Sequence, residues 1–191
     1  MNLLHHWLLN SDYWKRTVME EIVPWGLAGV ELGDNILEIG PGPGVTTDLL
    51  RRSHSRLTCV EIDAGLADGL RRRLGEGNVT VVTGDATALP FPDDSFTGAA
   101  AFTMLHHVPS PKLQDRILAE ACRVLRPGGV FAGTDSRWSL AMPIVHLFDT
   151  MVLVPPETMG ARLQAAGFTN VAVETAKSRF RFSARKPSTR S

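Results

Sequence analysis

Glycines and carboxylates fall in this chain at positions from which they could hold a nucleotide. Gly40, Gly42 and Gly44 follow one apolar run, and Glu61 and Asp63 follow the next one. Glycines let the backbone approach a ligand closely, and a carboxylate has enough lone pairs to accept hydrogen bonds from two ribose hydroxyls. An apolar run, a glycine turn, a helix-like stretch and a second apolar run with an acidic tip are typical of the first half of a nucleotide-binding α/β domain.

Two adjacent histidines, His106 and His107, follow the fourth apolar run. An imidazole titrates near neutral pH, so either ring could act as general base for a substrate that loses a proton. The loops after the strands of a parallel sheet carry its active site, which is where both rings would lie. The alternative is an ordinary loop in which one imidazole ring is packed and the other is solvated. The sequence does not indicate which of the two rings would act as the base.

The elements that must position these residues can be predicted from apolar periodicity and from glycine and proline. Helices are predicted at residues 12–31, capped by Asp12 and kinked or ended by Pro24, and at 45–53, 64–74, 111–125 and 157–166. Strands are predicted at residues 35–39, 57–62, 79–82, 97–103, 130–134, 169–174 and 179–184, with a turn at 126–129 before the fifth.

Strands that alternate with helices predict an α/β fold with a doubly wound, mostly parallel sheet and helices on both faces, here Rossmann-like with seven strands. No helix separates the last two strands, so we expect a hairpin that adds one antiparallel strand. Phe and Arg alternate in residues 179–184, as in a half-buried edge strand. The basic residues from Lys177 onward could bind nucleic acid or lipid, but we favour a solvated last strand with a frayed tail.

The size and composition are those of an ordinary globular protein. The chain has 191 residues, of which 20 are basic and 20 acidic, so no net charge attracts nucleic acid or a membrane. We expect one domain over residues 1–185, with a helical cap at 1–33 and a basic tail at 186–191. No run reaches the roughly 18 apolar residues of a membrane span, and the N-terminus has no pattern of a signal peptide.

The only two cysteines, Cys59 and Cys122, lie within apolar patterns. This predicts buried, reduced thiols and favours a cytoplasmic location. Two separated cysteines, together with the lack of a carboxylate-histidine cluster, predict no metal site.

The spacing of the glycines narrows the choice of nucleotide. A dinucleotide loop has a third small residue three positions after its second glycine, and here that position is Val45 or Thr47. Glu38, just before the loop, would repel a pyrophosphate but tolerate a cationic ligand. The only tyrosine is Tyr13, so no Tyr-x-x-x-Lys pair supports a nicotinamide-dependent oxidoreductase.

Four segments in order, ILEIGPGPG, VEID, GDATALPFPDDSF and RVLRPGG, resemble the class I S-adenosylmethionine-dependent methyltransferases. The resemblance covers about half of the chain and is nearest to the small-molecule branch, which includes the quinone C-methyltransferases (methyltransferase type 11). It implies S-adenosylmethionine as the cofactor and in-line transfer of its methyl group. One departure is Thr97, where the family usually has Asp, and it puts the local loop geometry in doubt.

The resemblance also implies roles for single residues. The glycines would approach the methionine part of the cofactor, and Glu61 would bind the ribose. Asp85 would accept a hydrogen bond from the adenine amino group, and the Ala86 amide would contact the ring. Thr103 and Met104 would line the methyl end, or pack in the core. The expected cofactor-binding residues are Glu38, Gly40, Gly42, Gly44, Glu61, Ile62, Asp85, Ala86, Thr103 and Met104.

The acceptor is expected to be small and apolar, because the segment 136–156 is rich in large apolar residues and follows the fifth strand. We expect this segment and the N-terminal helix to set selectivity, with the segment as a lid; core packing or a homodimer surface are the alternatives.

Two further alternatives concern the function itself. The ribosomal RNA adenine dimethyltransferases have a similar start, but their Asn-Pro-Pro-aromatic motif is replaced here from Thr103 onward, so no nucleic acid is expected. A non-catalytic, regulatory S-adenosylmethionine-binding protein is the last alternative.

Overall fold

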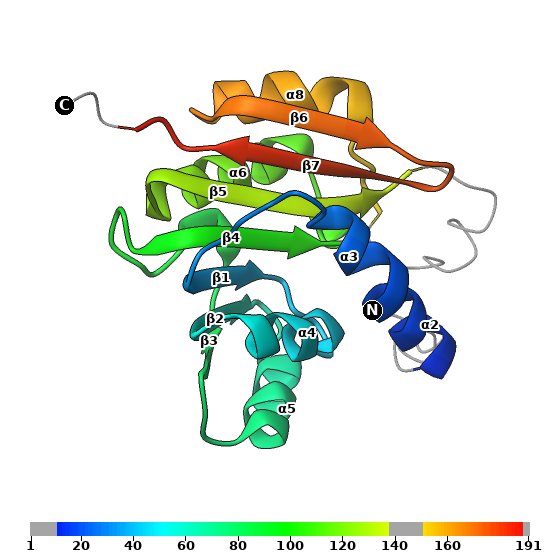
Figure 1. The fold of residues 1–191 in the computed structure, drawn as a ribbon, viewed down its shortest axis with the longest axis vertical. Coiled ribbons are helices and arrows are strands. Elements are labelled where there is room, and N and C mark those ends of the chain that lie inside the picture. The colour runs from blue at the N-terminus through cyan, green and yellow to red at the C-terminus, as the bar shows by residue number, and fades with distance from the viewer. Residues whose placement is uncertain (1–10, 138–150, 189–191) are drawn as a thin grey trace.

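The structure is a computed structural model that describes residues 11–137 and 151–188. Seven strands form one sheet in the order β3-β2-β1-β4-β5-β7-β6 (Figure 1). Strands β1 to β5 pair in parallel, and β7 pairs antiparallel with both β5 and β6, which confirms the predicted sheet and its hairpin. The strands are β1 (Asn35–Ile39), β2 (Arg56–Glu61), β3 (Val79–Thr83), β4 (Phe96–Phe102), β5 (Leu125–Ser136), β6 (Thr169–Thr175) and β7 (Arg179–Arg185).

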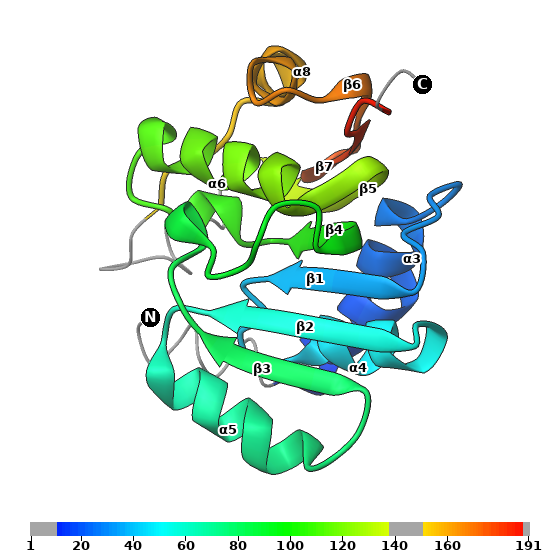
Figure 2. The same cartoon turned by 90° about the vertical axis from the view of Figure 1, so that its left-hand side faces the viewer.

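Helices cover both faces of the sheet. Figure 2 shows α6 and α8 on one side of the strands, with α3 and α4 on the other. The α-helices are α2 (Asp12–Thr17), α3 (Val23–Gly26), α4 (Val45–Ser53), α5 (Ala64–Leu74), α6 (Pro111–Val124) and α8 (Pro156–Ala165). Short turns of other helix types are the π-helical η1 (Val18–Ile22) and the 3-10 helices η2 (Ala86–Ala88) and η3 (Leu105–His107).

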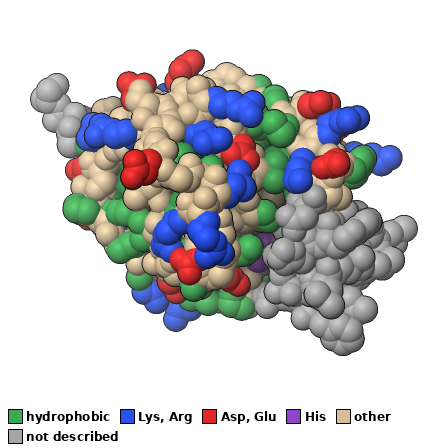
Figure 3. Space-filling view, turned by 90° about the horizontal axis from the view of Figure 1, so that it is seen from below, with side chains coloured by type: hydrophobic (Ala, Val, Ile, Leu, Met, Phe, Trp, Pro, Cys, Tyr) green, Lys and Arg blue, Asp and Glu red, His purple; other side chains and the backbone are tan. Residues whose placement is uncertain are grey.

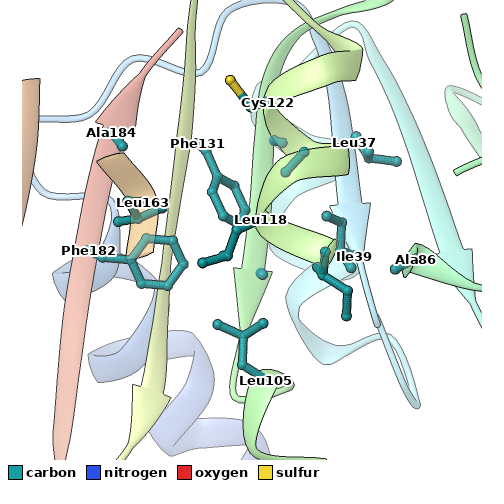
Figure 4. Close-up of a cluster of buried hydrophobic side chains, with 14 of the residues drawn as sticks. Leu37, Ile39, Ala86, Leu105, Leu118, Cys122, Phe131, Leu163, Phe182 and Ala184 are labelled. Atoms are coloured by element: carbon teal, nitrogen blue, oxygen red, sulfur yellow. The ribbon is translucent and has the colours of Figure 1, made fainter. Parts of the chain in front are cut away.

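Each face of the sheet has its own hydrophobic cluster. On the side of α6 and α8, Leu118 and Leu163 pack with Phe131 and Phe182 from the strands (Figure 4). The other cluster joins residues of η1, α3, α4 and α5 to the opposite side of β1, β2 and β4. Fully burying an aromatic or aliphatic side chain of this size contributes about 1.5–3 kcal/mol, so the two clusters hold the sheet rigid beneath its loops.

The N-terminal helix differs from the prediction. Its cap is Ser11, whose Oγ accepts a hydrogen bond from the Trp14 amide at 3.1 Å, and not Asp12. The helix also widens into the π-helical η1 and ends at Gly26 instead of residue 31. Pro24 has no amide hydrogen to donate to the carbonyl four residues earlier, which explains the break in the α-helical pattern just before it.

Two features of the C-terminal half also differ from the prediction. Residues 126–129 lie within β5 as an irregularity, because the pairing with β4 jumps from Leu125 to Val130. Strand β7 is not an edge strand, since β5 and β6 flank it. Its alternation is as predicted, with Phe180 and Phe182 buried and Arg179 and Arg181 partly exposed.

The basic residues of β7 and the residue after it serve internal contacts. Arg181 donates to the Trp25 carbonyl at 2.7 Å, and Lys186 donates to the Asp94 carboxylate at 2.7 Å. On the face seen in Figure 3, Lys and Arg side chains lie close to Asp and Glu rather than forming a patch of one sign. In the part of the chain that the structure describes, no helix is both long and apolar enough to cross a membrane.

Candidate functional site

A cavity of about 690 Å³ opens where the parallel strands end. Gly40 after β1, Glu61 at the end of β2, Asp85 after β3 and Thr103 after β4 all line it. The strand order reverses between β1 and β4, and ligands of open α/β sheets bind in the crevice at such a switch point.

The glycine loop requires glycine for two different reasons. Gly40, Gly42 and Gly44 all have φ in the left-handed region, at 67°, 54° and 86°. A Cβ on Gly44 would also lie 2.4 Å from the Leu70 side chain of α5, so the helix packs directly against this backbone. The loop can therefore curve tightly between β1 and α4 only with these residues.

Glu61 lines the cavity and is buried. One carboxylate oxygen accepts from the Gly42 amide and the other from the Asp63 amide, each at 3.0 Å. A carboxylate offers about four acceptor positions, so each oxygen can accept one more hydrogen bond. Asp63 instead caps α5, because its Oδ1 accepts from the Leu66 amide at 3.0 Å. This geometry suits Glu61, rather than Asp63, for a pair of ribose hydroxyls.

Asp85 and Ala86 line the cavity next to Glu61. The Asp85 Oδ1 accepts from the Thr87 amide at 2.8 Å, so this residue caps η2 as well as facing the cavity. Ile62 also lines the cavity, and 70% of its surface is exposed. The adenine contacts of Asp85 and Ala86 stay predictions.

Thr103 and Met104 follow β4 and both line the cavity. Thr103 has φ at 51°, which is uncommon for a residue other than glycine and marks a sharp turn of the chain. The Met104 side chain lies against the glycine loop, since a Cβ on Gly40 would be 3.1 Å from the Cβ of Met104. Whether these residues face the methyl end stays a prediction.

Glu38 lies behind the loop and is not among the residues that line the cavity, contrary to the expected direct contact. Its carboxylate is buried and accepts from the Thr46 hydroxyl, from the Thr47 hydroxyl at 2.6 Å and from the Cys59 thiol at 3.3 Å. Burial raises the pKa of Glu38, and burial beside this carboxylate raises the pKa of the Cys59 thiol. Thr46, which the sequence analysis did not single out, lines the cavity and connects it to Glu38.

The structure separates the two histidines. His107 lines the cavity, whereas His106 is buried and does not. The His106 Nδ1 is hydrogen-bonded to the Asp135 carboxylate, which also accepts from the His106 amide at 3.1 Å. The two imidazole rings lie 4.1 Å apart between centroids. Asp135 was missed by the sequence analysis, although a carboxylate near the end of the fifth strand is a signal that could have found it.

Apolar side chains also line the cavity. Trp14 and Val18 reach it from the N-terminal helix, while Phe102, Leu113 and Ile117 contribute from β4 and α6. Whether the N-terminal helix sets the selectivity for the acceptor stays a prediction. Most of the predicted lid, residues 138–150, lies outside the described residues.

The end of the predicted lid segment packs into the protein. Val154 is buried, and the Val152 carbonyl accepts from the Gln114 side chain at 2.7 Å. At this end, core packing is therefore the observed role.

Cys59 and Cys122 are buried and unbridged, as predicted. Within residues 11–137 and 151–188, no three His, Cys, Asp or Glu side chains are grouped as a metal site would require.

Thr97 occupies the place of the family's usual Asp. Its hydroxyl accepts from the Asn35 amide and donates to the Asn35 carbonyl, both at 3.0 Å. The start of β1 is thus tied to β4 without a carboxylate.

The comparison with protein families identifies the chain. The family described as "Methyltransferase domain" matches residues 37–133, which is 97 of the 191 residues. The chain therefore belongs to this family and to the class I S-adenosylmethionine-dependent methyltransferases.

Two curated relatives and one solved structure illustrate the similarity. A demethylmenaquinone methyltransferase of Clavibacter sepedonicus is 32% identical over 63% of this chain and 46% of its own length. A ribosomal RNA small subunit methyltransferase A of Parasynechococcus marenigrum is 32% identical over 64% of this chain and 39% of its own length. The chain thus spans less than half the length of either relative. The PH0226 protein of Pyrococcus horikoshii OT3 shares the fold, with a TM-score of 0.79, 18% identity and 93% of both chains covered.

The residues present fit the cofactor of the family, S-adenosylmethionine. The buried Glu61 carboxylate retains acceptor positions beside a backbone loop that can approach a ligand closely. The buried Glu38 carboxylate lies one hydroxyl away from the cavity, where negative charge suits a cationic ligand better than a phosphate.

Proposed function

We propose that the chain transfers the methyl group of S-adenosylmethionine to a small, hydrophobic acceptor by in-line displacement. The observation that carries the proposal is a cavity whose lining combines polar groups, among them Glu61, with apolar side chains such as Trp14, Phe102 and Ile117. When bound, S-adenosylmethionine supplies a methyl group that is already activated by its positive sulfur. The protein then has mainly to align the two molecules and exclude water.

The lining around Glu61 would hold the cofactor in a fixed position. Glu61 would bind the ribose, and the backbone of the glycine loop would follow the methionine part. The Gly40 and Gly42 amides donate to the Val60 carbonyl and the Glu61 carboxylate of β2, so this part of the lining is preorganised. A rigid site loses little conformational freedom on binding.

Apolar lining residues such as Trp14 and Phe102 would hold the acceptor and keep water away from the reacting atoms. Where the acceptor must lose a proton, His107 would take it, because His107 faces the cavity. His106 would act as a positioning residue, since Asp135 holds its ring and backbone and the two imidazoles are neighbours.

RNA is the second candidate acceptor, and the ribosomal RNA methyltransferase relative is the observation that favours it. The apolar lining of the cavity and the internal use of Arg181 and Lys186 favour the small molecule instead.

Calorimetric titration with S-adenosylhomocysteine tests the cofactor site. We expect micromolar binding to the wild type and a loss of about tenfold or more in Glu61→Ala, since a charged hydrogen-bonding partner is removed. Glu76→Ala, which removes an exposed carboxylate in the loop after α5, is the matched control and should bind like the wild type. A folded wild-type protein that does not bind would overturn the proposed function.

Turnover decides between the acceptors. The protein is incubated with labelled S-adenosylmethionine and one of three acceptors, which are a quinol such as menadiol, a long-chain fatty acid and ribosomal RNA. We expect a small molecule to become labelled. Labelled RNA in the absence of labelled small molecules would replace the proposal with the second candidate.

A further inference from the structure

Arg73, in the last turn of α5, reaches across to the glycine loop. Its Nη2 donates to the Pro43 carbonyl at 3.2 Å and to the Gly44 carbonyl at 3.1 Å. Its Nη1 donates to the Asp48 carboxylate at 2.7 Å, in the first turn of α4. One guanidinium therefore joins α5, the loop and α4.

These contacts fix the orientation of two successive peptide groups. In a planar trans peptide, the carbonyl and the following amide point in opposite directions. With the carbonyls of Pro43 and Gly44 directed at Arg73, the amides of Gly44 and Val45 must point away from it. The Gly44 amide then donates to the Pro41 carbonyl at 2.9 Å and closes the loop on itself.

At this point the loop packs against the side chains of Leu70 and Arg73, and of these two only Arg73 can donate hydrogen bonds to it. Gly44 is the N-cap of α4 and offers no side chain to cap it. A Cβ on Gly44 would lie 2.5 Å from Arg73 Nη2, so the guanidinium sits directly on this backbone. Arg71 on the same helix turn bonds to β3 instead, through the Val81 carbonyl at 3.0 Å.

We propose that Arg73 is a positioning residue for the cofactor: it holds the glycine loop in its binding conformation without itself lining the cavity. The proposal rests on the proposed function only in that the cavity binds S-adenosylmethionine. It assigns a role in binding to a residue that lies outside the four segments from which the family resemblance was drawn.

The chemistry of the guanidinium explains why arginine is used. Its planar fork donates in several directions at once, and here it serves three acceptors. A lysine could keep the ion pair with Asp48 but could not serve all three acceptors in the same way. The Arg73 side chain is 43% exposed, so salt screens its interaction with Asp48.

Calorimetric titration with S-adenosylhomocysteine tests the proposal on four proteins: wild type, Arg73→Ala, Arg73→Lys and Arg72→Ala. We expect affinity to fall by about fivefold in Arg73→Ala and by about twofold in Arg73→Lys, as for the loss of exposed hydrogen bonds. Arg72→Ala removes the same charge from the neighbouring, exposed position and should bind like the wild type.

The salt dependence of binding supplies a second measurement on the same proteins. Between roughly 0.05 and 0.5 M NaCl the affinity of the wild type should fall, and that of Arg73→Ala should fall less. A role in stability alone would lower the melting temperature of Arg73→Ala and leave both the affinity and its salt dependence unchanged.

The outcomes separate this proposal from the proposed function. If the wild type does not bind, the proposed function fails. If the wild type binds and Arg73→Ala matches Arg72→Ala in affinity and salt dependence, the cofactor site stands and the role of Arg73 is overturned.

Discussion

Two buried carboxylates of the site, Glu38 and Glu61, differ in what surrounds them. Glu61 accepts from two backbone amides and faces the cavity. Glu38 accepts from two hydroxyls and a thiol behind the loop, and burial raises its pKa. A buried charge without a cationic partner reduces stability, so a residue such as Glu38 is better explained by what it does for a ligand than by folding.

We expect Glu38→Gln to stabilise the ligand-free protein as pH rises. The pKa of Glu38 is raised above its ordinary value of 4.5, so the folded protein holds this proton more tightly than the unfolded chain. Unfolding then releases a proton, and the free energy of unfolding falls as pH rises from that ordinary value through the folded pKa. Glu38→Gln removes this loss. Thermal unfolding of both proteins from about pH 4 to pH 8 measures it.

The difference in melting temperature should grow in favour of Glu38→Gln over that interval. Thr47→Val keeps the carboxylate but removes a hydrogen bond that lowers the Glu38 pKa, so in this variant the loss of stability should extend to higher pH than in the wild type. If the melting temperatures of Glu38→Gln and the wild type change with pH in parallel, protonation of the Glu38 carboxyl does not affect the free energy of unfolding.

At the scale of elements, the parts of the fold that depend on local patterns were predictable. The bounds of β1, α4 and α5 match the prediction, because apolar periodicity and flanking glycines are local signals. The place of β7 between two strands and the irregularity at 126–129 depend on pairing with distant strands, which no local pattern shows.

Some residues of the candidate site could likewise be predicted from the sequence and others could not. Glu61 and the glycine loop were predictable, since their spacing along one βαβ unit fixes where they meet. Thr46 and Arg73 were not, because their roles depend on contacts between segments that meet only in the fold. Sequence reasoning therefore located the site but not the residues that support it.

The N-terminal element provides a prediction about the acceptor. Trp14 lines the cavity, whereas its neighbour Tyr13 is 76% exposed. We expect Trp14→Ala to raise the KM for a hydrophobic acceptor about tenfold, because a large apolar contact is lost, and to leave S-adenosylhomocysteine affinity unchanged. Tyr13→Ala is the matched control on the same helix. Steady-state kinetics with the acceptor that supports turnover decides the matter, and an unchanged KM in Trp14→Ala would remove this helix from acceptor binding.

At the scale of the whole molecule, one ligand site gathers segments from most of the described chain. The cavity is lined by residues from Trp14 to Ile117, and these come from both sides of the sheet and from four strand ends. The two hydrophobic clusters that hold these segments are the core of the protein. Ligand binding must therefore be linked to global unfolding rather than to the opening of one loop.

This linkage gives the last prediction. A ligand at about 100 times its Kd adds about 2.7 kcal/mol to the free energy of unfolding, and for a chain of this size that raises the melting temperature by roughly 5–11 °C. S-adenosylhomocysteine should produce this shift in the wild type and in Glu76→Ala, and about half of it or less in Glu61→Ala at the same concentration. Differential scanning calorimetry measures it directly. If calorimetric titration shows binding but the melting temperature does not move, S-adenosylhomocysteine binds the unfolded chain as well, and the cavity at the strand ends is not where its affinity arises.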